Sequence, residues 1–259
     1  MDLRKEKSEK MWWETIRKHE LSTAFTLFPN KKNLEMLEIG GRDGFQAQII
    51  SKEGFKVTSI DINPIYPQIY PVKKGDITNL DFQDDTFDII YSSNMLQEIV
   101  DIEKAFLEMK RVLKKDGIII HVVPSSWWSI ITNFFHYCFI PKYLIKSNRF
   151  QKMFNYKKNN TNNSNQDKNV TTLQKNNLKK LFFHPLGDNA SFLHEIYFFS
   201  KFYWKKLFEQ NGFKIMKKKN CPYFYSGYAV FKFKFVSIRK FLAKIYFPSC
   251  YCFVMKNDS

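Results

Sequence analysis

Three acidic residues and a glycine-rich turn in the first third of the sequence have the spacing of a nucleoside-binding site. Glu38 leads into Gly40-Gly41-Arg42-Asp43-Gly44, where glycines let the chain turn tightly beside a bound ligand. Asp61 ends a second apolar run about twenty residues later, where a carboxylate can accept hydrogen bonds from both hydroxyls of a ribose. Asp76 follows a third run, in position to meet the exocyclic amine of an adenine. Either acid alone is as consistent with a helix cap, but the two in register favour a nucleoside.

A dinucleotide is the less favoured ligand. The turn Gly40-Gly41-Arg42-Asp43-Gly44-Phe45 lacks the G-x-G-x-x-G spacing that holds a pyrophosphate. A glycine-rich turn by itself is weak evidence, because ordinary tight turns use the same residues. The acids that follow it therefore carry most of the argument.

The elements that position these residues alternate between short apolar runs and helical segments, which predicts a parallel sheet with crossover helices. We expect an amphipathic helix over residues 8–27 ahead of the first strand. The predicted strands lie near 35–39, 56–60, 70–73, 87–92 and 117–123, and the predicted helices near 44–52 and 101–113.

Two further segments carry a family resemblance. Residues 87–98 (FDIIYSSNMLQE) and 105–117 (AFLEMKRVLKKDG) complete the order of motifs that begins at Glu38, over about residues 34–124. The chain resembles class I S-adenosylmethionine (SAM)-dependent methyltransferases, particularly the branch similar to ubiquinone and menaquinone C-methyltransferases. The resemblance implies an α/β Rossmann-like fold with a seven-stranded, mostly parallel sheet, helices on both faces, an antiparallel last strand and a cap inserted after strand five.

The resemblance also implies roles for individual residues. Glu38 and the turn glycines would approach the methionine part of SAM, Asp61 would hold the ribose, and Asp76 with Ile77 would bracket the adenine. Ser93 and Asn94 would line the sulfonium end of the pocket. The implied cofactor-binding set is Glu38, Gly40, Gly41, Gly44, Asp61, Ile62, Asp76, Ile77, Ser93 and Asn94.

Two positions depart from the family pattern. Arg42 stands where the family usually has the middle glycine of its turn. Its side chain can point to solvent if the backbone dihedral angles there are ordinary, so we expect altered geometry and retained binding. Glu98 stands where this branch often carries a histidine, and either a base or a helix cap fits it.

Methyl transfer requires alignment of the acceptor and, for a hydroxyl, removal of its proton. After strand four the sequence lacks the Asn/Asp-Pro-Pro-aromatic run that holds planar amino groups, so carbon and oxygen acceptors are favoured. Candidate bases are His184, His194, Glu195 and Glu98, each with a structural role as the alternative. His121 lies inside a strand and is interpreted as a core histidine. The aromatic residues Trp127, Trp128, Phe134, Phe135 and Tyr137 fit an acceptor wall, a membrane-facing patch or ordinary core packing.

After Pro124 the regular pattern of strands and helices stops. Residues 142–180 hold ten lysines or arginines against the single acid Asp167, which predicts a mobile loop. A helix is expected at 200–210 and strands at 213–216 and 228–236, with a short helix at 238–247 ending the fold. The predicted organisation is a helical segment (1–30), a SAM-binding core (31–125), a cap (126–199) and a completing segment (200–259).

Charge and composition bound the partners. The net charge of +16 favours polyanions or anionic membranes as neighbours, although AT-rich coding also produces such a bias. We expect no metal, because the four cysteines form no paired cluster, and a cytoplasmic location with peripheral contact to an anionic membrane. The favoured function is a methyltransferase acting on a small, sugar-linked or lipid-linked acceptor, such as a sugar of a surface polysaccharide. The rival interpretations are an RNA-binding or RNA-modifying protein on the same fold and a non-catalytic SAM-fold subunit.

Overall fold

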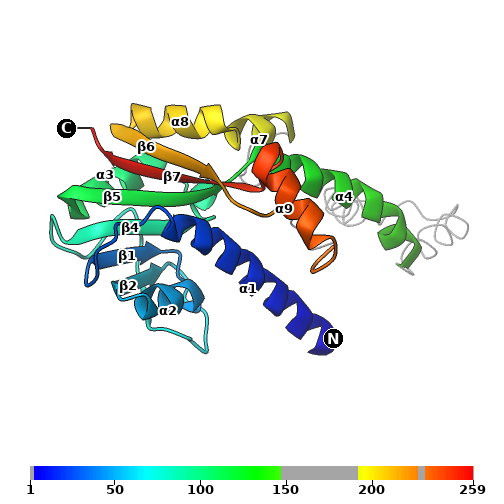
Figure 1. The fold of residues 1–259 in the computed structure, drawn as a ribbon, viewed down its shortest axis with the longest axis horizontal. Coiled ribbons are helices and arrows are strands. Elements are labelled where there is room, and N and C mark those ends of the chain that lie inside the picture. The colour runs from blue at the N-terminus through cyan, green and yellow to red at the C-terminus, as the bar shows by residue number, and fades with distance from the viewer. Residues whose placement is uncertain (1–2, 147–191, 227–230, 259) are drawn as a thin grey trace, which may run out of the picture.

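The computed structural model describes residues 3–146, 192–226 and 231–258 (Figure 1). The helices are α1 (Leu3–Phe25), α2 (Phe45–Lys52), the 3-10 helix η1 (Leu96–Glu98), α3 (Ile102–Val112), α4 (Ser126–Lys146), α7 (Phe192–Phe198), α8 (Lys201–Gln210) and α9 (Val236–Ile245). The strands are β1 (Glu35–Ile39), β2 (Lys56–Asp61), β3 (Val72–Lys74), β4 (Phe87–Ser93), β5 (Leu113–Pro124), β6 (Phe213–Asn220) and β7 (Cys250–Asn257).

One seven-stranded sheet organises the molecule, with the strand order β3-β2-β1-β4-β5-β7-β6. The neighbours from β3 to β5 pair in parallel, whereas β7 runs antiparallel to both β5 and β6. The predicted mostly parallel sheet with an antiparallel last strand is therefore confirmed. From β1 the strands follow one another toward one edge of the sheet as far as β3, and from β4 toward the other edge. The strand order therefore reverses between β1 and β4, which is where α/β sheets of this type bind ligands.

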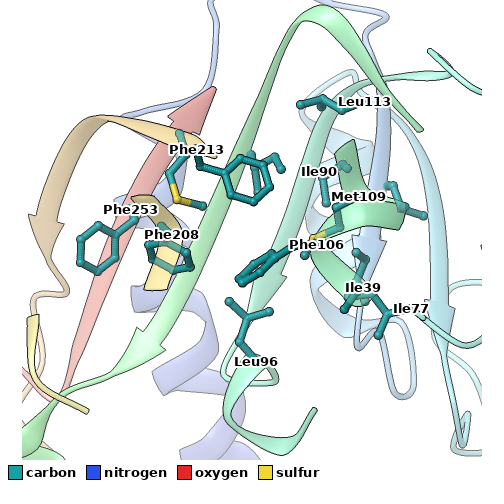
Figure 2. Packing of buried hydrophobic residues seen from close by; sticks show 14 of the residues in the cluster. Ile39, Ile77, Ile90, Leu96, Phe106, Met109, Leu113, Phe208, Phe213 and Phe253 are labelled. Atoms are coloured by element: carbon teal, nitrogen blue, oxygen red, sulfur yellow. The ribbon is translucent and has the colours of Figure 1, made fainter. Parts of the chain in front are cut away.

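Helices cover both faces of the sheet. On one face, α3 and α8 pack their apolar side chains against β4, β5 and β7, and Phe106, Phe208 and Phe213 are among the most deeply buried residues there (Figure 2). On the other face, α1 and α2 pack against the alternate residues of the same strands, around Trp12 and Ile50. Because successive residues of a strand point to opposite faces, the central strands are apolar on both sides.

The prediction of a strand at 228–236 is wrong for 231–236, the part of it that the structure describes. Residues 232–235 form a turn in which Lys232 and Phe235 have φ angles of 35° and 54°, and α9 begins directly afterwards. The last strand is β7, in the run Cys250-Tyr251-Cys252-Phe253-Val254-Met255. A strand buried on both faces is apolar throughout, so the alternating pattern indicated the wrong segment.

The expectation that regular structure stops after Pro124 is also wrong. Helix α4 extends from Ser126 to Lys146, so the first residues of the predicted 142–180 loop are helical. The apolar run at its start has few polar residues to mark a helical face, and its period was therefore hidden. Most of the predicted loop lies outside the described residues.

His121 is buried in β5, and its Nδ1 lies 2.7 Å from the hydroxyl of Ser92. Its Nε2 has no hydrogen-bond partner within the described part of the chain. Burial lowers the pKa of His121 to about 3, so the ring is neutral at ordinary pH.

This burial makes stability depend on pH. The unfolded chain binds a proton at His121 below about pH 6.5 and the folded protein only below about pH 3, so stability is lost as pH falls through that window. Between pH 7 and 5 the free energy of unfolding should fall by about 2 kcal/mol more in the wild type than in His121→Gln. Urea titrations of both proteins measure this difference, and parallel pH curves would contradict it.

Candidate functional site

The carboxyl ends of β1, β2 and β4 meet at the point where the strand order reverses. The backbone N–H groups of Gly40 and Gly41 both donate to the carbonyl of Ile60 at the end of β2, over 2.9 and 3.0 Å. Gly40 also faces the turn after β4, since a Cβ there would lie 3.2 Å from the side chain of Met95. The glycine-rich turn is therefore held between the two neighbouring strand ends.

Two of these glycines are required by their surroundings. A Cβ on Gly41 would lie 1.9 Å from the hydroxyl oxygen of Ser59. Gly44 precedes α2 with a φ of 80°, and a Cβ there would lie 2.4 Å from the carbonyl oxygen of Tyr70. The close approach of backbone that the sequence predicts at this turn is present.

Glu38 lies beneath the turn, with only 2% of its surface exposed. Its Oε2 accepts a 2.6 Å hydrogen bond from Ser59, which pairs with it across β1 and β2. Burial raises the pKa of Glu38 to about 7, although the hydrogen bond from Ser59 lowers it. The carboxyl group is thus able to change charge near neutral pH, and a nearby cation would favour its ionised form.

Asp61 ends β2 and holds the backbone on both sides of the site. Its two carboxylate oxygens accept the N–H groups of Arg42 and Asn63, over 2.9 and 2.8 Å. A carboxylate has about four acceptor sites, so these two bonds leave capacity for further donors. The next side chain, Ile62, is apolar yet 59% exposed. An acceptor and an apolar surface therefore lie side by side at the end of this strand.

Arg42 does not have the ordinary backbone angles on which the expectation for it rested. Its φ is 51°, in the left-handed region that favours glycine, while its side chain is exposed. The family's usual glycine and this arginine thus serve the same turn geometry. Its N–H still donates to Asp61, so the turn keeps its connection to β2.

Asp76 and Ile77 lie just after β3. Asp76 is exposed, and its Oδ1 accepts hydrogen bonds from the backbone N–H and the hydroxyl of Thr78, which lower the pKa of its carboxyl group. The side chain of Ile77 is only 7% exposed and packs in the core (Figure 2). It supports the turn from beneath.

A buried polar group that the sequence did not indicate lies at the carboxyl end of β4. Glu20 of α1 is fully buried, and its Oε2 accepts hydrogen bonds from Arg17 (2.5 Å), Asn94 (3.1 Å) and Ser93 (3.3 Å). Its Oε1 accepts from the hydroxyl of Tyr225 (2.5 Å) and lies 3.3 Å from the thiol of Cys250, whose single proton is shared between Glu20 and the Oδ1 of Asn94. We call these six residues the Glu20 cluster.

The cluster is organised around one carboxylate that only accepts hydrogen bonds. Burial raises the pKa values of Tyr225 and Cys250 well above their usual range, and Glu20 raises both further. Both groups therefore stay protonated and serve as donors. The amide of Asn94 is oriented from two sides, because its Nδ2 donates to Glu20 while its Oδ1 lies 3.2 Å from the thiol of Cys250.

A small hollow adjoins the cluster on the side of Tyr225. Aromatic rings and an aliphatic side chain supply most of its wall, with two hydroxyls and one guanidinium. The lining residues are Ile131, Phe135, Phe224, Tyr225, Ser226, Phe231 and Arg239. The walls come from α4, the segment after β6 and the start of α9. As the side chains stand, the hollow has room for about one water molecule, and Tyr225 lies between it and Glu20.

The three candidate bases that the structure describes lie in two separate elements, η1 and α7. Glu98 is exposed in η1, and His194 is exposed on α7, where it stacks on Phe198. Glu195 is buried and accepts a 2.7 Å hydrogen bond from Ser129, which joins α7 to α4. His184 lies outside the described residues. A catalytic role for any of the four stays a prediction.

The aromatic residues at 127–137 divide among three environments. Trp127 packs edge-on against Phe247, and Trp128 packs against the core. Phe135 lines the hollow, whereas Phe134 and Tyr137 are exposed. Core packing is confirmed for Trp128, whereas the acceptor wall and the membrane-facing patch stay predictions for the other members.

Sequence reasoning missed Glu20, although a signal was present. Trp12, Ile16, Glu20 and Ala24 follow one another at intervals of four and are all fully buried. An acid in an otherwise apolar helical stripe is a signal, because a glutamate is almost never fully buried unless it has a partner. Tyr225 and Cys250 left no comparable signal, since both lie among aromatic and apolar neighbours.

Known proteins confirm the expected family. The sequence model of a family described as a methyltransferase domain matches residues 12–218. No curated protein matches the sequence. Among solved structures, a SAM-dependent methyltransferase from Mesorhizobium loti shares the fold with a TM-score of 0.53 at 12% sequence identity, over 92% of this chain and 98% of its own. A protein from Listeria monocytogenes assigned as a SAM-dependent methyltransferase gives a TM-score of 0.54 at 11% identity, over 93% and 98% of the two chains. A chain of the Haloferax volcanii complex between the Trm112 methyltransferase activator and a protein assigned as a methyltransferase gives a TM-score of 0.55 at 11% identity, over 98% and 93%.

The matched residues run from α1, which supplies Glu20, through the strand ends described above to β6. At 11–12% sequence identity the solved structures support the fold alone. The family model supports family membership, because it matches most of the sequence. The ubiquinone and menaquinone branch stays a prediction. The chain belongs to the methyltransferase-domain family, and it is a SAM-dependent methyltransferase with the class I fold.

Proposed function

We propose that this enzyme methylates an oxygen or carbon atom of a small, sugar-linked or lipid-linked acceptor. The observation that carries the proposal is the Glu20 cluster, which fixes Ser93 and Asn94 at the carboxyl end of β4. The family resemblance puts the sulfonium end of SAM at these two residues. The apolar hollow behind Tyr225 adjoins the same point.

The residues around the glycine turn fit SAM. The carboxyl group of Glu38, with a pKa of about 7, suits the cationic methionine part, and the open acceptor positions of Asp61 suit the ribose hydroxyls. The exposed side chain of Ile62 offers an apolar surface to the adenine. SAM supplies a methyl group on a positively charged sulfur, so the protein has mainly to position the two reactants.

The Glu20 cluster performs the positioning. Methyl transfer would require the acceptor atom to be aligned with the methyl group of SAM, and a fixed set of polar atoms at the end of β4 would provide that alignment. Asn94 cannot turn its amide without breaking hydrogen bonds to Glu20 and Cys250, so its polar atoms are preorganised. We assign Glu20 and Tyr225 as positioning residues, because both act through their neighbours.

The side chains that line the hollow would have to move apart to admit an acceptor, and most of them are apolar. Ile131, Phe135, Phe224 and Phe231 would contact hydrocarbon, while Ser226 and Tyr225 provide hydroxyl groups. RNA, the alternative acceptor, has a charged backbone, for which this wall offers a single cation, Arg239. The site therefore favours the lipid-linked or small-molecule class.

The cofactor site is tested with Asp61→Ala. Removal of a charged acceptor for both ribose hydroxyls should weaken SAM binding about 100-fold. Titration calorimetry measures the affinity, and thermal melting verifies the fold. Asp116→Ala removes an exposed acid at the other end of β5 and should bind like the wild type. If Asp61→Ala binds SAM as tightly as the wild type, the assignment of Asp61 to the ribose is wrong.

Glu38 predicts a pH dependence of SAM binding. Below about pH 7 the free enzyme holds a proton on Glu38, which must leave when the cationic part of SAM binds. The affinity should therefore rise about tenfold between pH 6 and pH 8, with release of a proton. Calorimetry at both pH values compares the wild type with Glu38→Gln. The proposal for Glu38 fails if the two proteins show the same pH dependence.

The acceptor class is tested by transfer from methyl-tritiated SAM to separated lipid, oligosaccharide and RNA fractions of cells. Label should enter the lipid or oligosaccharide fraction.

Tyr225→Phe should lower kcat about tenfold and change SAM affinity less than threefold, because it removes one hydrogen bond to Glu20. Tyr197→Phe changes an exposed tyrosine and is the matched control. Label in RNA, or a folded Tyr225→Phe enzyme with parental kcat, would refute the proposal.

A further inference from the structure

Helix α9 presents an apolar stripe to solvent. Ile238, Phe241 and Ile245 are spaced three and four residues apart and are 59%, 62% and 43% exposed. The opposite side of the helix is directed inward, with Arg239 and Ala243 buried. A surface helix usually turns such a stripe toward the core, so its outward orientation marks an interaction surface.

Basic residues accompany this stripe. Lys240 and Lys244 are exposed one turn apart on α9, and Lys232 and Lys234 lie in the turn before it. The sequence from Lys214 to Lys256 contains ten lysines or arginines and no acidic residue. An apolar stripe beside lysines is the pattern of a helix that lies in the surface of an anionic bilayer.

Aromatic residues extend the apolar surface beyond both ends of α9. Phe233 and Phe235 precede the helix and are 42% and 61% exposed, and Tyr246 follows it at 72%. Aromatic rings are favoured at the boundary between headgroups and acyl chains. No helix in the part of the chain that the structure describes is long and apolar enough to cross a membrane. A contact in the plane of the surface is therefore the geometry that fits.

The helix is held rigidly against the rest of the enzyme. Arg239 donates hydrogen bonds to the carbonyls of Phe224 and Lys232, over 2.7 and 2.6 Å, and its guanidinium lies 4.9 Å from the rings of both Trp12 and Tyr223. Figure 1 shows α9 between α1 and α4. Contact at this helix would bring the wall of the hollow close to the surface, because Phe224 and Arg239 line it.

We propose that the exposed surface of α9, with the apolar stripe of Ile238, Phe241 and Ile245 and with Lys240 and Lys244 along one side of it, docks on an anionic lipid bilayer. The apolar stripe enters the boundary between headgroups and acyl chains, and the lysines contact the anionic headgroups. The bilayer is favoured over RNA, because RNA would bind the lysines and leave the apolar stripe exposed to water. The proposal is independent of the acceptor, since docking requires neither SAM nor transfer.

Vesicle co-sedimentation of the full chain tests this docking. The wild type should sediment with phosphatidylglycerol–phosphatidylcholine vesicles and bind pure phosphatidylcholine at least about tenfold more weakly. Both the Ile238→Ser/Phe241→Ser/Ile245→Ser triple variant and the Lys240→Glu/Lys244→Glu variant should lose at least about tenfold in affinity for the anionic vesicles. Circular dichroism verifies that each variant is folded.

Matched controls change similar residues elsewhere. Leu107→Ser/Phe202→Ser removes side chains that are 66% and 70% exposed on α3 and α8, and Lys206→Glu/Lys214→Glu reverses two exposed charges on α8 and β6. Both should bind vesicles like the wild type. The proposal is overturned if the wild type stays in the supernatant, if the controls lose as much binding, or if the triple serine variant binds normally. A wild-type dimer that the serine variant converts to monomer, without vesicle binding, would assign the face to a second copy of the chain.

Discussion

A carboxylate buried away from water is stable only when donors surround it, and Glu20 obtains these donors from separate parts of the chain. Arg17 comes from the same helix, Ser93 and Asn94 from the end of β4, Tyr225 from the segment after β6, and Cys250 from the start of β7. Loss of any of these partners would leave part of a buried charge unsatisfied, which is strongly unfavourable. The hydrogen bonds therefore tie α1 to the functional edge of the sheet.

The cofactor side of the site depends on close backbone approach. Gly41 has room for no side chain beside Ser59, and the N–H groups of the turn are held by Ile60 and Asp61. Arg42 shows that the backbone conformation is the constraint, since it keeps a left-handed φ with a large side chain directed outward. The turn and the Glu20 cluster meet across β1 and β4, so cofactor and acceptor would approach each other at the reversal of strand order.

Arg239 connects this site to the surface proposed for membrane contact. Its guanidinium packs between Trp12 of α1 and Tyr223, two residues before Tyr225, and it holds the carbonyl of Phe224. The same residue is buried on the inner side of α9, whose outer side carries the apolar stripe. A lipid-linked acceptor held at the surface would thus lie near the hollow without a large movement of the chain. The family, the docking surface and the acceptor class support one another chemically but rest on separate observations.

The sequence by itself determined the five parallel strands, the glycine turn and the family, because these depend on local period and on residues close together in the chain. Glu38, Asp61 and the glycines could be predicted to meet, since parallel strands end at one edge. Only the tertiary structure decided that β7 is the run at Cys250, that helix α4 follows β5 soon after Pro124, and that Glu20 and Tyr225 lie beside Ser93 and Asn94. Those features depend on which faces are buried and on contacts between residues as far apart as Glu20 and Cys250. Local sequence cannot specify such contacts, because the donors are satisfied only after the sheet and α1 have packed.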